Sequence, residues 1–172
     1  MEHTEEQFLS QLQAHAGIIH RICRSYFAEE ELRKDVYQEI VYQLWKSYPT
    51  FKGLSKFSTW MYKIALNTAI TYHRKAERSS KEQEWVEHAE MIADGEVNEE
   101  LKAQVDRLYS AINTLTEVEK AIILLYLDEH RYEEIAAICG MTVKNVSVRL
   151  VRIKKKLEKY FKKKQVNYGN IR

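Results

Sequence analysis

The strongest constraint on the fold is the spacing of the apolar residues, which recur every three or four positions along most of the chain. In one segment this spacing places a whole set of side chains on one helix face, namely Phe57, Trp60, Met61, Ile64 and Ala65. The 172 residues include one proline and five glycines, too few for the many turns of an all-β chain. The sequence therefore predicts an all-α protein.

Local start and stop signals divide this pattern into separate helices. Thr4 and Thr116 each stand three residues before a Gln or Glu, an arrangement in which two side chains bond the free N–H groups of a helix start. We expect a helix after each threonine, another over about residues 30–47 and another from about residue 57 to 72. Tyr48 should leave the α conformation, because the ring of Pro49 crowds the residue before it.

Charge is distributed unevenly along the chain, although the formal net charge is only +2. Residues 52–76 contain five bases and no acid, and residues 144–172 contain eleven bases and one acid. Between them, residues 77–107 contain ten acids and four bases. Two basic blocks separated by an acidic one indicate two contacts with a polyanion such as nucleic acid. Solvated lysine-rich helix faces are the alternative, and for the C-terminal tail taken alone they are the favoured one.

The acidic block shows weak periodicity, which predicts a flexible linker between two helical clusters. Ser79 and Ser80 are expected to break the preceding helix, and Asn98 can cap the following one. We place one small helical domain at residues 1–77, the linker at 78–104, a second helical domain at 105–164 and a tail at 165–172.

The segment from Glu133 to Val146 predicts a short helix, a tight turn at Gly140 and a second helix capped by Thr142. Ala136 and Ala137 are small enough to let the two helices cross closely. This is the pattern of a helix-turn-helix, whose second helix enters the DNA major groove. The inward seam of that helix would comprise Val143, Val146, Leu150, Ile153 and Leu157. The DNA-facing candidates are Thr142, Lys144, Asn145, Ser147, Val148, Arg149 and Arg152.

The segment from Phe51 to Asn67 mixes aromatic and basic residues around a loop, a combination that suits single-stranded DNA because unpaired bases stack on rings while cations follow the backbone. Phe57 and Trp60 fall on the apolar seam, where a ring is more often part of the hydrophobic core. The better contact candidates lie off that seam and are Tyr62, Lys63, Asn67, Thr71 and Arg74.

Three segments, Asp35–Trp45, Phe51–Gly53 and Phe57–Asn67, together resemble region 2 of the extracytoplasmic-function (ECF) sigma factors of bacterial RNA polymerase, in the sigma-70 family. The segment Leu115–Leu157 resembles region 4 of the same family. The resemblance implies a three- or four-helix bundle at 1–77 and a helix-turn-helix domain at 105–164. It also implies a protein that joins core polymerase and directs promoter recognition.

The resemblance implies roles for particular residues. Contacts with the β′ clamp helices of core polymerase would come from Asp35, Gln38, Glu39, Tyr42 and Trp45. The −10 promoter element would meet Phe51, Lys52, Gly53, Lys56, Trp60, Tyr62, Lys63, Asn67 and Arg74, with a flipped base held by the loop. Region 4 would meet the β flap and place its final helix in the −35 element. A cognate anti-sigma factor is a further expected partner.

The chain departs from the usual family pattern in two places. Glu129–Tyr132 stands where the family commonly has Gly-x-Ser-Tyr. Lys144–Arg149 replaces a commoner Gly-Thr-Val-Lys/Arg-Ser-Arg, which alters base-facing positions and therefore the DNA sequence that is recognised.

Enzyme motifs are absent from the sequence, including GxxxxGK[ST], GxGxxG and HExxH. His20 and Cys23 could share a helix face but lack a clear third metal ligand, and Glu133 and Glu134 fit a solvated face better than a catalytic pair. We therefore expect no enzymatic activity, no metal and no cofactor.

Cys23 and Cys139 stand far apart, which fits a reducing, cytoplasmic setting. The N-terminal residues do not resemble a signal peptide, and no stretch has the apolar length of a membrane span, so no membrane insertion is expected. Two alternatives are a helix-turn-helix regulator that acts without joining polymerase and a helical protein–protein adaptor.

Overall fold

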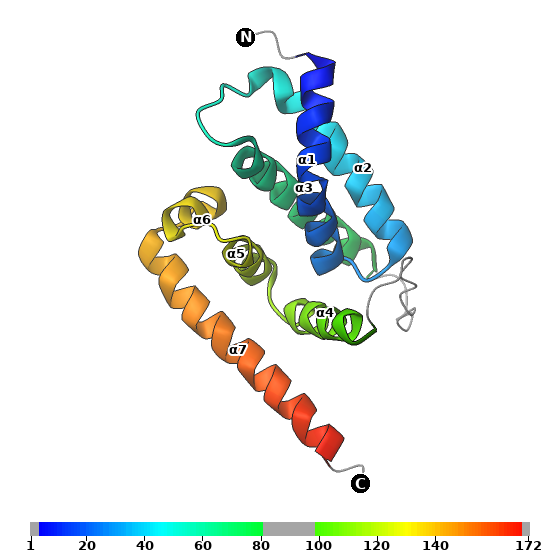
Figure 1. Ribbon diagram of the computed structural model, residues 1–172, viewed down its shortest axis with the longest axis vertical. Coiled ribbons are helices and arrows are strands. Elements are labelled where there is room, and N and C mark those ends of the chain that lie inside the picture. Colours follow the sequence, from blue (N-terminus) through cyan, green and yellow to red (C-terminus); the bar gives the residue numbers. More distant parts are fainter. Residues whose placement is uncertain (1–3, 81–98, 170–172) are drawn as a thin grey trace. The chain divides into compact units, whose positions relative to one another are not determined.

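The computed structural model describes residues 4–80 and 99–169, which form seven α-helices, one short 3-10 helix and no strand (Figure 1). The all-α prediction is confirmed for this part of the chain. The chain divides into two compact units, residues 1–92 and 93–172. Asn98 and most of the predicted linker lie outside the described residues.

The first unit is a bundle of three helices, α1 (Glu5–Tyr26), α2 (Glu30–Ser47) and α3 (Phe57–Ser80), in which each helix packs against the other two (Figure 1). Its core consists of fully buried side chains that include Ile19, Ile22, Ile40, Leu44 and Met61. Burial of this apolar surface is the main stabilising contribution to such a bundle.

The start of α1 confirms the predicted capping box, because Thr4 Oγ1 accepts a hydrogen bond from the Gln7 N–H at 3.3 Å and Gln7 Oε1 accepts one from the Thr4 N–H at 3.4 Å. The helix before Pro49 ends at Ser47, as predicted, but the expected conformation of Tyr48 is wrong. Tyr48 keeps α torsions (φ −58°, ψ −38°) and opens the 3-10 helix η1 (Tyr48–Thr50). Pro49 fits the first turn of η1, where its missing N–H removes no helical bond. Packing also holds Tyr48, which is 5% exposed and lies 5.1 Å from the Phe8 ring.

Ser79 and Ser80 do not break the third helix but form its last two residues. Serine lowers helix stability only slightly at a helix end, where water can hydrogen-bond the last carbonyl groups. The helix thus continues beyond the boundary at residue 77 that the sequence suggested.

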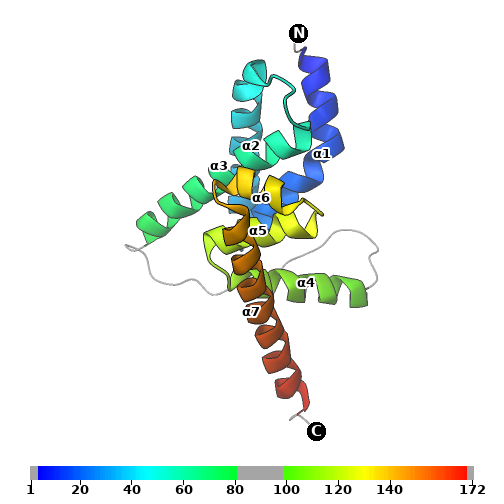
Figure 2. The same ribbon diagram turned by 90° about the vertical axis from the view of Figure 1, so that its left-hand side faces the viewer.

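The second unit contains α4 (Glu99–Asn113), α5 (Glu117–Leu127), α6 (Tyr132–Cys139) and α7 (Val143–Gly169). Helices α5, α6 and α7 pack on one another, and α4 contacts α7. Ile112, Ile122, Leu125, Ile135 and Leu150 are each at most 1% exposed and form its core. Both views show α7 as one long helix whose C-terminal half extends beyond α5 and α6 (Figures 1 and 2).

Three predicted caps in this unit are confirmed. Thr116 Oγ1 accepts a hydrogen bond from the Glu119 N–H, and Thr142 Oγ1 accepts one from the Asn145 N–H at 3.2 Å. Gly140 adopts the left-handed conformation (φ 66°, ψ 40°) at the end of α6. These local signals fix the helix-turn-helix between α6 and α7.

Two predictions about packing in the helix-turn-helix are wrong. Ala136 is buried, but Ala137 is exposed because it lies about 100° further round the same helix. Val143 is 40% exposed, since the first residue of α7 precedes the part of the helix that meets its neighbours. The seam of α7 therefore begins at Val146.

None of the described helices combines the length and the apolar character needed to cross a lipid bilayer.

Candidate nucleic-acid and protein interfaces

The outward face of the second helix in the helix-turn-helix is polar and open to solvent. Its seam residues Val146, Leu150 and Ile153 are at most 1% exposed and turn toward α5 and α6. The DNA-facing candidates are all exposed: Thr142, Lys144, Asn145, Ser147, Val148, Arg149 and Arg152. A face with hydrogen-bond donors and one apolar side chain has the chemistry that reads base edges in a major groove.

Two lysines of the C-terminal basic block bind α5. Lys156 Nζ lies 2.6 Å from Glu119 Oε1, and Lys154 Nζ donates to the Tyr126 hydroxyl at 2.8 Å. Lys154 Nζ also lies 4.1 Å from the centre of the Tyr126 ring, and the hydrogen bond to Tyr126 raises the pKa of Lys154. These two contacts join α7 to α5, so at least part of the basic block has a structural role.

Glu119 is the centre of this contact, with its side chain 12% exposed. Burial favours the neutral carboxyl, but hydrogen bonds from Lys156 and Thr116 outweigh that effect and lower the pKa of Glu119. The same carboxylate accepts a bond from the Thr116 N–H at 3.0 Å. One charged group therefore caps α5 and ties α7 to it.

In the first unit, the loop between η1 and α3 is flanked by a cluster of rings. Trp60 lies 5.0 Å from the Phe51 ring and 5.3 Å from the Phe57 ring, and Phe57 is buried. Gly53 has φ +67°, and Lys52, Leu54 and Lys56 are exposed, Leu54 by 90%. The rings pack together beside the loop, and the residues at the loop tip are exposed to solvent.

Helix α3 continues this surface. Lys63, Asn67 and Arg74 are exposed at spacings of four and seven, which place them on one helix face. Thr71 is exposed as well. Tyr62 does not belong to this surface, because it is 1% exposed. The expectation that Tyr62 lies off the buried seam is wrong, since α3 packs against both α1 and α2 and so buries a wider stripe than one seam.

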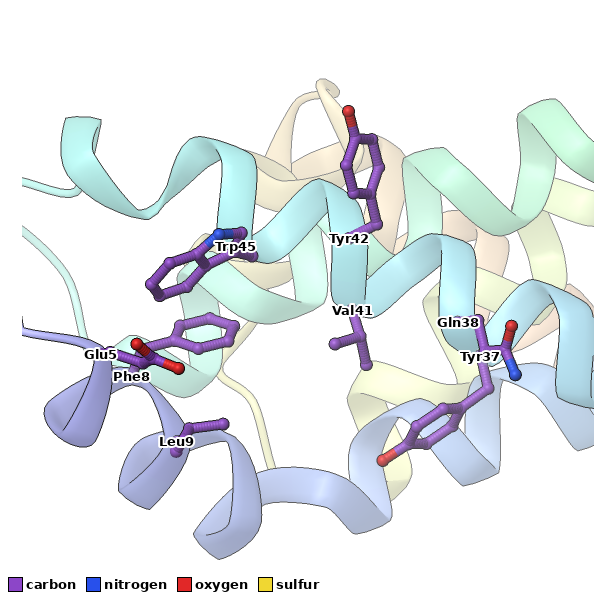
Figure 3. Close-up of a pocket in the computed structure, with 8 residues that line it drawn as sticks. All are labelled: Glu5, Phe8, Leu9, Tyr37, Gln38, Val41, Tyr42 and Trp45. Carbon is purple, nitrogen blue, oxygen red and sulfur yellow. The ribbon is translucent and has the colours of Figure 1, made fainter.

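A groove of about 390 Å³ runs between α1 and α2 (Figure 3). Its apolar floor includes Phe8, whose ring lies 5.1 Å from the Trp45 ring. Leu9 and Trp45 are each 45% exposed, and Tyr42 is 55% exposed. The full lining is Glu5, Phe8, Leu9, Tyr37, Gln38, Val41, Tyr42 and Trp45.

Three of the five residues expected to contact polymerase border this groove, namely Gln38, Tyr42 and Trp45. Asp35 is exposed, while Glu39 is half-buried and accepts a hydrogen bond from Gln43 at 2.8 Å. The side of the groove formed by α1, with Glu5, Phe8 and Leu9, was not predicted from the sequence. Its signal was Leu9, an apolar residue beside Phe8 that the stripe of the first helix does not need.

A second, more polar cavity of about 490 Å³ shares Tyr37 and Gln38 with the groove. His20 stacks on Tyr37 at 4.7 Å between ring centres. His20 is exposed while Cys23 is 3% exposed, so these two residues do not form a metal-binding pair at the surface. Burial raises the pKa of Cys23 to about 12 and that of Cys139 in the second unit to about 11.

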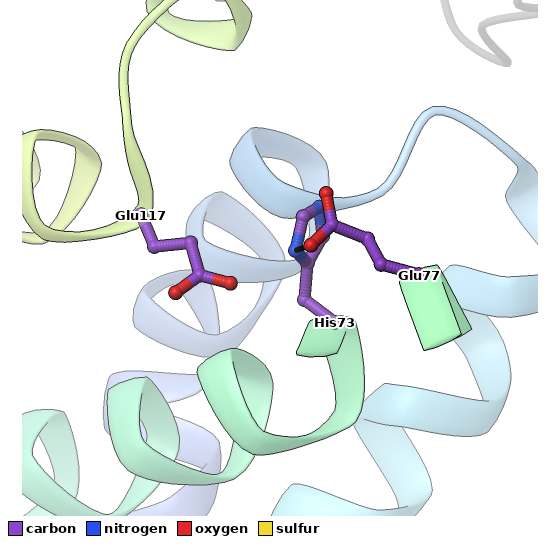
Figure 4. Close-up of side chains that lie close together, drawn as sticks. All are labelled: His73, Glu77 and Glu117. Carbon is purple, nitrogen blue, oxygen red and sulfur yellow. Dashed lines mark ion pairs between the residues drawn. The ribbon is translucent and has the colours of Figure 1, made fainter. Parts of the chain in front are cut away.

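His73 and Glu77 form an ion pair on α3, with Nδ1 and Oε2 3.8 Å apart (Figure 4). The Tyr26 and Phe27 rings lie 6.2 and 5.8 Å from the His73 ring. Among the described residues of the first unit, no third His, Cys, Asp or Glu joins this pair closely enough to ligate one metal ion.

Comparison with known proteins gives two family matches. Residues 12–79 match the family "Sigma-70 region 2", and residues 106–157 match "Sigma-70, region 4". The chain is 33% identical over 135 residues to the ECF RNA polymerase sigma-E factor of Haemophilus influenzae, covering 72% of this chain and 71% of that one. The sigma-E factor of Escherichia coli K12 is 34% identical over 138 residues, with the same coverage. SigV of Bacillus subtilis is 29% identical over 139 residues, covering 80% and 81%.

Solved structures that share the fold include two protein complexes. One is the sigma factor RpoE of Bartonella quintana in complex with the anti-sigma factor NepR, with a TM-score of 0.76, 20% identity and coverage of 91% of this chain and 98% of that one. The other is CnrH in complex with the cytosolic domain of CnrY, with a TM-score of 0.68, 19% identity and coverage of 92% and 90%.

A helix-turn-helix unit preceded by a helical bundle with an aromatic and basic loop is the architecture of the sigma-70 class. The matches fall on both units and in the order that the class has them. The chain belongs to the sigma-70 family, in its ECF group of RNA polymerase sigma factors.

Proposed function

We propose that this chain is a sigma factor that binds core RNA polymerase and directs promoter recognition and transcription initiation. The single observation that carries the proposal is the presence of two different DNA-type surfaces, one on each unit, within matches to regions 2 and 4. Such a protein works by binding and acts beside polymerase in the cytoplasm, without enzymatic activity of its own.

The α1–α2 groove is the proposed docking site for the β′ clamp helices of core polymerase. Half-exposed Leu9 and Trp45 offer apolar area that a partner helix could bury, and Gln38 adds a polar group at the edge. Aromatic side chains that are partly exposed around a pocket are the usual anchors of protein interfaces. Exposed Asp35 and half-buried Glu39 extend the same helix beyond the groove.

The two DNA surfaces suit different forms of the promoter. The loop from Phe51 to Lys56 and the α3 face with Lys63, Asn67 and Arg74 suit the opened −10 element. The outward face of α7, with Arg149 and Arg152, suits the closed major groove of the −35 element. By resemblance, the second unit also meets the β flap of polymerase.

A cognate anti-sigma factor is a further proposed partner. The two solved structures described above are complexes with a second protein, and in the Bartonella quintana structure that protein is an anti-sigma factor. The same groove and basic faces that polymerase and DNA need are available to such an inhibitor.

The alternative of a helix-turn-helix regulator that acts without polymerase is not favoured. It accounts for the second unit but leaves the region 2 match over residues 12–79 without a role. An adaptor without DNA affinity would leave both exposed basic faces without a role.

The proposal is tested by run-off transcription with core polymerase and a promoter library. We expect promoter-specific transcripts from the intact chain, and loss of polymerase binding in the double variant Gln38→Ala with Trp45→Ala. Tyr42→Ala is a second variant, because this half-exposed ring can be removed with little effect on the bundle. Circular dichroism verifies that each variant keeps its helices.

Glu31→Ala with Lys46→Ala is the matched control, since both residues are exposed on α2 and outside the groove. The control should bind polymerase normally. Normal binding by both groove variants would place the docking surface elsewhere. Absence of any polymerase-dependent transcript would contradict the proposed function itself.

A further inference from the structure

Helix α7 is longer than the family match requires. The region 4 match ends at residue 157, whereas the helix continues to Gly169. The stretch after residue 157 is rich in lysine, and the sequence alone favoured a solvated tail for it. The structure makes it a continuation of the DNA-facing helix.

The exposed lysines of this stretch do not point in all directions. Lys155, Lys159 and Lys163 are spaced four residues apart, so they lie on one face, and all three are exposed. This set, called the basic ridge below, follows directly on Arg152 at a spacing of three. The ridge therefore prolongs the DNA-facing surface along the same helix.

Three other lysines of the basic block form hydrogen bonds or ion pairs within the second unit, unlike the ridge lysines. Lys154 and Lys156 bind α5, and Lys162 forms an ion pair with Glu158. Among the described residues, no acid forms a salt bridge with Lys155, Lys159 or Lys163. The hydrogen bond from Lys162 lowers the pKa of Glu158 and Lys155 lies near enough to contribute, but no ridge lysine forms a close ion pair within the described fold.

The opposite side of the extension is apolar and partly covered. Leu157, Tyr160 and Phe161 are half-buried and continue the seam of Leu150 and Ile153. The Tyr160 and Phe161 rings lie 5.7 Å apart, and α4 packs against α7. Packing on this side fixes which way the ridge faces.

Helix geometry indicates what the ridge can reach. Arg149 and Lys163 are separated by about 21 Å along a helix that rises 1.5 Å per residue. The DNA major groove is about 12 Å wide. If Arg149 lies in the groove, Lys155 is about 9 Å further along the helix and so lies near the groove edge. Lys159 and Lys163 lie beyond that edge, where phosphates and not base edges are within reach. Lysine, a flexible point charge, suits phosphates better than base-specific pairing.

We propose that the basic ridge binds the phosphate backbone of duplex DNA next to the −35 element and adds affinity without sequence preference. The proposal rests on the proposed function, because it takes α7 as the helix that enters promoter DNA. It goes beyond the family match, since Lys159 and Lys163 lie after its last residue.

The test compares Lys155→Gln/Lys159→Gln/Lys163→Gln with the intact chain. Binding of each full-length protein to a fluorescein-labelled, mixed-sequence 40-base-pair duplex is measured by anisotropy over a salt series. Each lost phosphate contact should reduce the slope of log K against log salt by about 0.9, so we expect a reduction of about two to three. Glutamine keeps a helix propensity close to that of lysine.

The matched control is Lys34→Gln/Lys46→Gln/Lys102→Gln, which removes the same charge from α2 and α4 and should leave the slope unchanged. An unchanged slope in the ridge variant would show solvated lysines and overturn the proposal. An unchanged slope with weaker binding to core polymerase would also overturn it, in favour of an acidic protein surface.

A transcription assay distinguishes failure of the proposed sigma function from failure of the proposed ridge contact. Promoter-specific run-off transcripts from the intact chain test the sigma function independently of the ridge. A reduced slope without such transcripts would leave the ridge as a DNA contact and contradict the sigma function. Transcripts with an unchanged slope would contradict the ridge alone.

Discussion

At the scale of single residues, the end of α5 contains a backbone conformation that glycine would adopt more easily. The Glu129 N–H donates to the Tyr126 carbonyl and the His130 N–H to the Leu125 carbonyl, each at 3.1 Å, which is the bond pair of a Schellman motif. Glu129 occupies its left-handed position with φ 61°. The family commonly has glycine at the corresponding place in the pattern, so this departure has a local energetic cost.

We predict that Glu129→Gly stabilises the second unit. The left-handed conformation costs a residue with a Cβ about 1–2 kcal/mol, and the greater freedom of glycine in the unfolded chain cancels about half of that gain. The free energy of unfolding should rise by about 0.5–1 kcal/mol, measured from amide exchange of α5 and α6 in the native protein.

Gly140→Ala is the opposite change and serves as the control. A Cβ at Gly140 meets no atom within 4 Å, so its cost arises from φ +66° and not from a clash. The Gly140→Ala substitution should lower the free energy of unfolding of the second unit by about 1 kcal/mol. A Glu129→Gly variant that is less stable than the parent would show that the glutamate side chain contributes more than its backbone costs.

Residue-level predictions from the sequence succeeded where the signal is local. Gly140 and the capping threonines, Thr4 and Thr116, depend on neighbours three or four positions away, and the sequence contains all of that information. Tyr62 and Val143 depend on how many helices pack around them, which periodicity along one helix does not reveal. The left-handed Glu129 was missed because glutamate gives no sign of it, although the absent family glycine pointed to the place.

At the scale of helices, one buried carboxylate adds a charged contact to the apolar packing between α5 and α7. Glu119 bonds Lys156 from α7 and caps its own helix at Thr116. The sequence showed eleven bases in one block without distinguishing the two that bind α5. The α1–α2 groove was hidden for the same reason, since it exists only where two helices lie side by side.

We predict that the Glu119–Lys156 pair stabilises the second unit in a pH-dependent way. The pKa of Glu119 is lowered from its ordinary value of 4.5, so the folded state favours the ionised carboxylate. The contribution is complete above pH 4.5 and is lost as the pH falls through the lower pKa of the folded protein. Urea unfolding between pH 7 and pH 3 should show this loss, and Glu119→Gln should weaken the dependence.

A double-mutant cycle with Lys156→Met measures the pair itself. Because the Lys156 side chain is 53% exposed, we expect a coupling energy of about 0.5–1 kcal/mol at pH 7. The Glu158–Lys162 pair on the open face of α7 is the control and should couple more weakly. Equal coupling in the two pairs, or none at pH 7, would contradict a structural role for Glu119.

At the scale of the whole molecule, the proposed function assigns two different states of DNA to the two units. The first unit offers a loop with exposed cations over a ring cluster, together with the exposed α3 face. The second offers a helix shaped for a closed groove. Family and fold class could be predicted from the sequence because each unit carries its own motif in a contiguous stretch, whereas the assignment of the two DNA states stays a prediction.

We predict that substitutions in the two units fail at different steps. Arg152→Ala should weaken duplex binding, by about 1–3 kcal/mol at one base pair if the arginine pairs with guanine. Asn67→Ala should leave duplex affinity intact and impair open-complex formation with core polymerase. Duplex affinity and permanganate reactivity of the opened strands are measured separately for each variant. The assignment of the two surfaces is wrong if Asn67→Ala abolishes duplex binding or Arg152→Ala acts only after strand opening.

The buried Cys23 thiol and the half-buried Cys139 thiol have a practical consequence for observing DNA binding by the loop of the first unit. With pKa values raised to about 12 and about 11, Cys23 and Cys139 stay protonated near neutral pH, and thiols react with maleimides chiefly as thiolates. A cysteine introduced at the exposed tip of the loop, for example Leu54→Cys, would then react far faster than either native one. The two native cysteines should therefore contribute little to labelling with a maleimide dye. A fluorophore at the loop tip could then report the binding of a promoter strand in real time.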